Sequence, residues 1–247
     1  MKVMILAAGY GVRLHPITRT LSKALIEIGG KPMIEHVVEK FSRFGEITIV
    51  TNRKFAGDFG HWRKRFAQRH PDIPIRLLDN GSTSVENRLG ANGDIVFSIE
   101  EAGLSGKELL IVGSDNLFTE PQDAFVHFAT DKPATIATCD LGSREEVKRF
   151  AAVTTEANGR IISFEEKPDN PPSTLAGTML YHLAATTVPL AREYLDSGGN
   201  TDNAGYFFAW LGSRIETFAC PLKGEWIDVG SHGCLKRALE LTAAKQS

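Results

Sequence analysis

Residues 3–16 read Val3-Met4-Ile5-Leu6-Ala7-Ala8-Gly9-Tyr10-Gly11-Val12-Arg13-Leu14-His15-Pro16, an apolar run that leads into two glycines and an arginine. The unbroken apolar run is typical of a parallel strand covered on both faces. A strand that ends in Gly-x-Gly lets the backbone approach an anion closely and point N–H groups at it. The dinucleotide-binding fingerprint is the obvious rival, but it requires a third glycine where this chain has Leu14.

Two cations accompany this glycine loop. Arg13 lies two residues after Gly11, and Lys23 lies at the end of the same loop, within Ser22-Lys23-Ala24-Leu25. Arginine offers a forked donor to phosphate and lysine a compact charge, so the pair suits a polyphosphate. The alternative interpretation is a tight turn with surface cations.

Outward from the loop, the first half of the chain alternates strands with helices. β-branched and apolar runs predict the strands, and apolar residues at helical spacing predict the helices. The expected strands span 3–8, 47–51, 73–78 and 108–112, and the expected helices begin after Pro32 and cover 55–66 and 94–102. This alternation predicts an α/β fold, a Rossmann-like, doubly wound sheet with helices on both faces.

The second half of the chain differs, because its short strands follow one another at hairpin-like spacing. The expected strands span 134–139, 151–155, 160–164 and 178–182, and helical patterns return at 187–196, 203–211 and 234–244. The sheet is therefore expected to be mixed, with a smaller lobe of antiparallel strands.

Composition narrows the classes of function. The 247 residues include 28 Lys and Arg against 30 Asp and Glu, which argues against a chain-wide grip on nucleic acid or on an anionic membrane. No run of apolar residues is long enough to span a bilayer. Cys139, Cys220 and Cys234 form neither a zinc pattern nor an even disulfide set, so we expect a reducing, cytoplasmic compartment.

Motifs in five parts of the chain occur in the same order as the motifs of a known family. They are the glycine loop 9–18 with 22–25 and 30–34, Leu110-Ile111-Val112-Gly113-Ser114-Asp115-Asn116, Phe164-Glu165-Glu166-Lys167-Pro168, Gly177-Thr178-Met179-Leu180-Tyr181 and Trp226-Ile227-Asp228-Val229-Gly230-Ser231. Together they resemble the sugar-1-phosphate nucleotidyltransferases, the NDP-sugar pyrophosphorylases. The chain departs from the usual motifs at Val12, which replaces a threonine, and at Ser114, which separates the glycine from the aspartate.

The resemblance implies the nucleotide-diphospho-sugar transferase type of this fold and a reaction of class EC 2.7.7. A nucleotidyl group passes from an NTP to a sugar 1-phosphate, forming an NDP-sugar and pyrophosphate. A phosphate oxygen attacks the α-phosphorus in line, and no general base is required because that oxygen is already anionic. The expected catalytic residues are Arg13, Lys23 and Asp115. Asp115 and Asp228 are the expected ligands of Mg²⁺, the implied cofactor.

The resemblance also implies which residues bind the two substrates. The expected nucleotide-binding residues are Leu6, Ala7, Ala8, Gly9, Gly11, Asn80 and Gly90. Asn80 is expected to hydrogen-bond the edge of the base, although the family's usual Gly-Thr-Ala sequence is missing and Leu89-Gly90-Ala91 is its nearest equivalent. Lys167 is expected to bind the sugar phosphate, Glu166 the sugar hydroxyls, and Gly177 to line the sugar site.

We expect one nucleotidyltransferase domain over residues 1–247, without a C-terminal extension. Its nucleotide-binding lobe would cover 1–117 and its sugar-phosphate-binding lobe 118–247. The expected partners are an NTP and a phosphorylated sugar, with no nucleic acid and no membrane; the assembly state stays open, a homo-oligomer included. Two other functions also stay open: transfer to a non-sugar phosphate such as a cyclitol, polyol or choline phosphate, and a catalytically idle regulatory relative.

Overall fold

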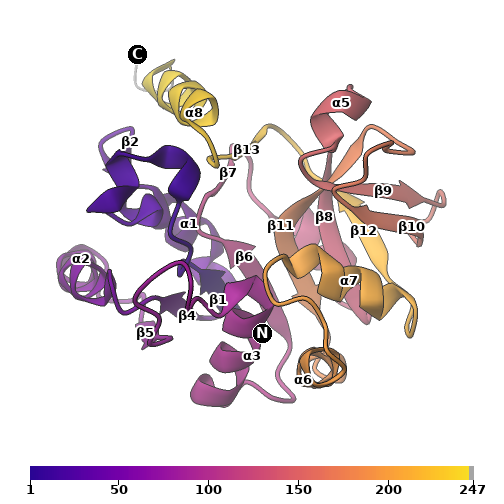
Figure 1. Ribbon diagram of the computed structural model, residues 1–247, viewed down its shortest axis with the longest axis horizontal. Helices are drawn as coiled ribbons and strands as arrows, with labels where there is room; N and C mark the ends of the chain where they lie inside the picture. Colours follow the sequence, from indigo (N-terminus) through magenta and orange to yellow (C-terminus); the bar gives the residue numbers. More distant parts are fainter. Residues whose placement is uncertain (245–247) are drawn as a thin grey trace.

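The centre of the protein is a mixed, nine-stranded β-sheet, seen in a computed structural model that describes residues 1–244 (Figure 1). Its strands are β1 Lys2–Leu6, β4 Glu46–Thr51, β5 Ile75–Asp79, β6 Leu109–Gly113, β8 Ala134–Asp140, β9 Ala151–Thr155, β10 Ile161–Glu166, β11 Leu175–Leu183 and β12 Phe218–Pro221. Along the main path the order is β10-β9-β11-β6-β1-β4-β5, with β8 paired to β11 and β12 paired to β8.

Helices and short elements surround this sheet. The helices are α1 Met33–Phe41, α2 Ala56–Arg69, α3 Gly90–Ala102, α4 Asp123–Ala129, α5 Arg144–Val147, α6 Leu190–Asp196, α7 Ala204–Gly212 and α8 His232–Ala244. The short elements are the 3₁₀ turns η1 Val12–Leu14, η2 Ile17–Arg19, η3 Lys23–Leu25 and η4 Ser42–Phe44, the pair β2 Glu27–Ile28 and β3 Lys31–Pro32, and the pair β7 Asn116–Phe118 and β13 Trp226–Asp228. No helix within residues 1–244 is long and apolar enough to cross a membrane.

Strand β1 is the central parallel strand of the first half. Ile5 pairs with Ile49 of β4 on one side and with Val112 of β6 on the other. Val3 and Ile5 pack into an apolar cluster with α1 and α2, whereas Met4 packs into the cluster that contains α3. Since alternate side chains enter clusters on opposite faces, the apolar run is buried on both faces. The predicted doubly wound sheet, with helices on both faces, is confirmed.

Strand β11 joins the two halves of the sheet. Its Leu180 pairs with Val112 of β6 and its His182 pairs with Thr135 of β8, both in antiparallel register. β9 and β10 extend this antiparallel region beyond β11. The second half is therefore antiparallel, as predicted, and it belongs to the same sheet as the first.

The pair β7 and β13 brings the motif that contains Asp115 beside the motif that contains Asp228. Asp228 lies opposite Asn116, and the N–H of Val229 donates to the carbonyl of Asp115 at 2.9 Å. Helix α8 follows at once, and its Leu235 packs with Leu14 of the glycine loop in a shared apolar cluster. Residues 226–244 are thus packed on the N-terminal part of the fold.

Helix α3 begins at Gly90, four residues before the predicted start at 94. The first N–H groups of a helix have no partner within it. Here the N–H groups of Ala91 and Asn92 donate to the carbonyls of Asp202 and Thr201, at 3.1 and 2.9 Å. The sequence-based prediction missed the early start because those carbonyls come from a segment far along the chain.

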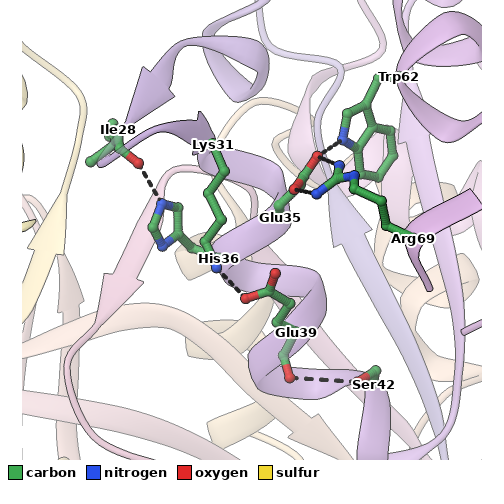
Figure 2. Close-up of polar contacts among 8 residues, drawn as sticks. All are labelled: Ile28, Lys31, Glu35, His36, Glu39, Ser42, Trp62 and Arg69. Carbon is green, nitrogen blue, oxygen red and sulfur yellow. Dashed lines mark hydrogen bonds and ion pairs between the residues drawn. The ribbon is translucent and has the colours of Figure 1, made fainter. Parts of the chain in front are cut away.

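A buried carboxylate links α1 to α2 (Figure 2). Glu35 is 1% exposed, and its Oε1 accepts from Trp62 Nε1 at 2.9 Å. The guanidinium of Arg69 donates to both of its oxygens, at 2.7 and 3.1 Å. On the same helix, Glu39 pairs with Lys31 at the surface instead. Burial without partners would be costly for a carboxylate, so these three hydrogen bonds explain why Glu35 is tolerated in the core.

We predict that Glu35→Ala lowers the free energy of unfolding by about 2–3 kcal/mol, because it leaves the Trp62 N–H and half of the Arg69 guanidinium without their acceptor. Glu39→Ala is the matched control on α1, and it should lower that energy by less than about 1 kcal/mol because its ion pair is exposed. Urea denaturation measures both, and equal effects of the two variants would contradict the prediction.

Candidate functional site

Two adjoining cavities lie at the carboxyl ends of β1 and β6, where open α/β sheets bind their ligands. The first has a volume of about 420 Å³ and the second about 220 Å³. Ala91, Asp115, Met179 and Asp202 line both cavities, so the two meet at Asp115. A larger cavity of about 650 Å³, between α1, β7 and α8, contains none of the residues predicted for the site.

All but one of the predicted site residues line these two cavities. The first cavity is lined by Leu6, Ala7, Ala8, Gly9, Gly11, Lys23, Gly90 and Asp115. The second is lined by Arg13, Asp115, Glu166, Lys167, Gly177 and Asp228. Asn80 lines neither cavity. Apart from Asn80, the residues expected to bind the nucleotide therefore line the first cavity. Those expected to bind the acceptor line the second.

The glycine loop is held open at its first glycine and tightly packed at its second. A Cβ at Gly9 would meet nothing within 4 Å, which leaves the backbone there accessible to a ligand. Gly11 has φ +60°, and a Cβ there would lie 3.1 Å from Thr18 Cγ2. Thr18 Oγ1 also donates to the carbonyl of Gly11 at 2.7 Å. Gly11 is needed for both its left-handed backbone and this close packing.

Lys23 and Asp115 form an ion pair at the junction of the cavities. Burial alone would raise the pKa of Asp115, but the Lys23 ammonium beside it outweighs burial and lowers that pKa. Asn116 Nδ2 adds a hydrogen bond to Asp115 Oδ1 at 2.9 Å. Asp115 is therefore ionised at neutral pH.

Asp228 is the second carboxylate at this junction. Burial raises its pKa to about 6, and the neighbouring charge of Asp115 acts in the same direction, against Lys23, Arg13 and Arg149. Its Oδ1 is buried without a hydrogen-bond partner among the described residues. A buried carboxylate oxygen without a protein partner, beside a second carboxylate, fits the oxygen donors that Mg²⁺ prefers. No cluster of three or more His, Cys, Asp or Glu within residues 1–244 competes with this pair as a metal site.

Glu166 and Lys167 lie at the end of β10, in the second cavity. Burial raises the pKa of Glu166, against the opposing charge of Lys167, whose Nζ lies 3.6 Å from Glu166 Oε1. Lys167 is a non-glycine residue with φ +49°, an uncommon backbone conformation that concentrates at functional sites. Gly177 lies across the sheet, and a Cβ there would come within 2.8 Å of Ile136 Cδ1.

Asn80 lines neither cavity, and its side chain hydrogen-bonds to two neighbouring residues. Its Oδ1 accepts from the N–H and the hydroxyl of Ser82, at 2.9 and 2.8 Å, and its Nδ2 donates to Asp94 Oδ1 at 2.6 Å. Asp94 lines the first cavity and is 6% exposed. Burial raises the pKa of Asp94 to about 7. The sequence pattern predicts a helix from residue 94 and assigns Asp94 no role; an acidic residue within an apolar helical pattern is the available signal.

Three further residues of the site were missed or differently placed. Arg149 lines the second cavity, and its charge acts on Asp228. Arg88 lines the first cavity and donates to both oxygens of Asp202, at 3.0 and 2.9 Å. Met179 forms part of the wall common to both cavities. Met179 lies within a quoted motif, but nothing in the spacing of Arg88 or Arg149 marked them, because their neighbours are distant in the sequence.

Comparison with known proteins identifies relatives along nearly the whole chain. A family model described as nucleotidyl transferase matches residues 2–245. The chain is 29% identical over 239 residues to a UTP–glucose-1-phosphate uridylyltransferase of Synechocystis sp., covering 93% of this chain and 60% of that protein. It is 28% identical over 254 residues to a glucose-1-phosphate thymidylyltransferase of Neisseria meningitidis, covering 100% of this chain and 84% of that protein.

A solved structure shows the same fold. UDP-glucose pyrophosphorylase complexed with UDP-glucose superposes with a TM-score of 0.80 at 20% identity, covering 99% of this chain and 98% of that one. The chain spans about 60% of the length of the cyanobacterial uridylyltransferase.

We predict that Asp94 makes the free energy of unfolding depend on pH. Its pKa rises from 3.8 to about 7 on folding. The folded protein therefore binds the additional proton between about pH 4 and pH 7, and its stability falls as the pH rises through that window. Asp94→Asn keeps an oxygen acceptor for Asn80 and should be the more stable protein at pH 8, by about 2–4 kcal/mol, with the difference shrinking at pH 5.

Urea denaturation of both proteins at pH 5 and pH 8 measures this difference. Asp72→Asn, at an exposed aspartate, is the control and should follow the unchanged protein at both pH values. A stability difference between Asp94→Asn and the unchanged protein that is the same at both pH values would show that Asp94 does not titrate in this window.

Proposed function

The chain belongs to the nucleotidyl transferase family, and we propose that it transfers a nucleotidyl group from an NTP to a sugar 1-phosphate. The products are an NDP-sugar and pyrophosphate. The observation that carries the proposal is the junction of two cavities at Asp115, with cations on both sides of it. Such an arrangement suits a reaction that must hold two anionic substrates in line and stabilise the charge between them.

The proposed chemistry is a displacement at the α-phosphorus. An oxygen of the acceptor phosphate attacks the α-phosphorus of the NTP and forms a new P–O bond. The bond from the α-phosphorus to the bridging oxygen breaks, and the electron pair leaves with pyrophosphate. Because the attacking oxygen is already ionised, the residues at the junction have no proton to remove; their task is positioning and charge stabilisation.

In the first cavity, the glycine loop and Lys23 bind the triphosphate. The accessible backbone at Gly9 approaches the phosphates, and Lys23 neutralises charge on the departing pyrophosphate. The backbone of Leu6–Ala8 and Gly90 lines the same cavity and is proposed to hold the nucleoside. Arg13 reaches the second cavity, where it faces the reacting phosphate.

Asp115 and Asp228 are proposed to hold Mg²⁺. The partnerless oxygen of Asp228 and the ionised carboxylate of Asp115 supply its protein ligands. When bound, the ion would withdraw charge from the phosphate oxygens that it contacts. Before the ion binds, the Lys23 ammonium keeps the Asp115 carboxylate ionised.

In the second cavity, Lys167 is proposed to bind the acceptor phosphate, and Glu166 the sugar hydroxyls, with Gly177 at the wall. Residues 1–117 would form the nucleotide-binding lobe and 118–247 the acceptor lobe of one domain, of which 245–247 lie outside the described residues. We further propose a cytoplasmic enzyme, since the three cysteines are unpaired. A cyclitol, polyol or choline phosphate remains the alternative acceptor.

Pyrophosphate release tests the function across a matrix of NTPs with sugar phosphates and with cyclitol, polyol and choline phosphates. We expect turnover with at least one sugar 1-phosphate and loss of turnover when Mg²⁺ is removed by EDTA and not restored. Turnover only with a non-sugar phosphate would move the acceptor to the alternative class. No turnover with any pair would favour the idle regulatory relative.

Lys23→Ala tests the phosphate-binding assignment. It removes the cation at the junction, so kcat/KM for the NTP should fall by about 10²-fold or more, as for the loss of one charge-stabilising donor. Thermal melting establishes that the variant is folded. Lys64→Ala, on the exposed face of α2, should keep the kinetics of the unchanged protein. Unchanged kinetics in folded Lys23→Ala would overturn the assignment.

A further inference from the structure

The first turn of α7 lies against the two side chains proposed to bind the acceptor. We infer that Asn203 and Gly205 are positioning residues, Asn203 for Lys167 and Gly205 for Glu166. This inference rests on the proposed function, because it assumes that Lys167 and Glu166 contact the acceptor. Asn203 and Gly205 act through those two side chains and do not need to contact the reacting atoms.

Asn203 fixes the ammonium group of Lys167. The Lys167 side chain is 45% exposed, so without a partner it would sample many rotamers. Its Nζ donates to Asn203 Oδ1 at 2.9 Å, and its backbone N–H donates to the carbonyl of Phe150 at 3.0 Å. The φ of +49° at Lys167 also constrains the direction in which its side chain leaves the backbone. The ammonium is therefore oriented before any acceptor phosphate arrives.

Gly205 leaves room for the carboxylate of Glu166. A Cβ at position 205 would overlap Glu166 Oε2. The Glu166 side chain is only 9% exposed, and it lies where that Cβ would be. Glycine weakens a helix relative to alanine, so a glycine in the first turn of α7 is unfavourable for the helix itself. The space that it leaves for Glu166 accounts for it.

The turn that carries both residues is anchored to the nucleotide half of the site. Asn92 of α3 is 2% exposed, and its Nδ2 donates to the backbone carbonyls of Asn203 and Asn200, at 2.8 and 2.7 Å. Arg88 holds Asp202 through both carboxylate oxygens. The position of Lys167 is thus set by contacts that begin beside the first cavity.

Asn203→Ala and Gly205→Ala in the full chain test the inference. Each should raise KM for the sugar 1-phosphate by about tenfold, the order expected for one charge-assisted hydrogen bond or one displaced carboxylate. KM for the NTP and kcat should stay as in the unchanged protein. Asn203→Asp keeps an oxygen acceptor for Lys167 and should restore the lower KM. Because the new Cβ displaces a buried carboxylate, thermal melting of Gly205→Ala serves to establish that the variant is folded.

Double variants show whether each residue acts through its neighbour. In a Lys167→Ala background, Asn203→Ala should have no further effect on KM for the sugar 1-phosphate, and in a Glu166→Ala background Gly205→Ala should have none. Full, independent effects in these backgrounds would overturn the inference.

Two control variants are matched to the test variants. Gly212→Ala lies at the other end of α7, where a Cβ would make an ordinary contact at 3.4 Å with Thr217 Oγ1, and Asn170→Ala removes an exposed asparagine. Both should leave KM for the sugar 1-phosphate unchanged.

Failure of the proposed function is recognised separately, by the unchanged protein turning over no NTP and sugar phosphate pair. Crystal structures of Asn203→Ala and Gly205→Ala then decide the positioning itself. A displaced or disordered Lys167 ammonium and a displaced Glu166 carboxylate would support it. Lys167 and Glu166 unmoved in the two variants would overturn it.

Discussion

The carboxylates of Asp115 and Asp228 lie in one confined space and repel each other, and the surrounding cations compensate this repulsion. The backbone brings them together, because β13 pairs with β7 and the N–H of Val229 bonds to the carbonyl of Asp115. Lys23 compensates one carboxylate directly, while Arg13 and Arg149 act on the other from across the second cavity. The near-neutral net charge of the chain therefore conceals a strong local separation of charge, which the proposed anionic substrates and divalent cation would require.

The two halves of the sheet contribute to this site in different ways. In the parallel half, β1 and β6 both end at the same edge, so their loops supply backbone and Asp115 to the first cavity. In the antiparallel half, β11 runs past that edge in the opposite direction and supplies wall residues such as Gly177 and Met179. The two halves of the sheet meet where β11 pairs with β6 in antiparallel register. The boundary between the two cavities therefore lies where the strand direction changes.

Sequence reasoning succeeded where a local pattern determines the structure. The apolar run before Gly9, the β-branched strand at 47–51 and the aromatic spacing of α2 each carry their own signal, and the structure confirms them. Asp115 and Asp228 were found by motif, and the fold brings them together. The role of Asn80 at the base stays a prediction, and Ser82 and Asp94 hold its amide. That engagement, like the early start of α3, depends on partners that no local pattern announces.

Strand β12 and helix α4 were not predicted, since their short apolar runs lack a distinguishing period. The sequence also could not predict the positive φ of Lys167. The following proline favours an extended backbone at that residue, and tertiary contacts override the preference. Asn203 and Gly205 lie within a correctly predicted helix region, yet nothing in it indicates that its first turn faces β10.

Helix α8 has a consequence for the order in which the protein is made. Leu14, beside the glycine loop, is fully buried, and Leu235 of α8 belongs to the apolar cluster that covers it. A ribosome synthesises residue 14 before residue 235, so the inner face of the glycine loop lacks this cover until residue 235 has been made. We expect the glycine loop to acquire its final packing only after residue 235 has left the exit tunnel.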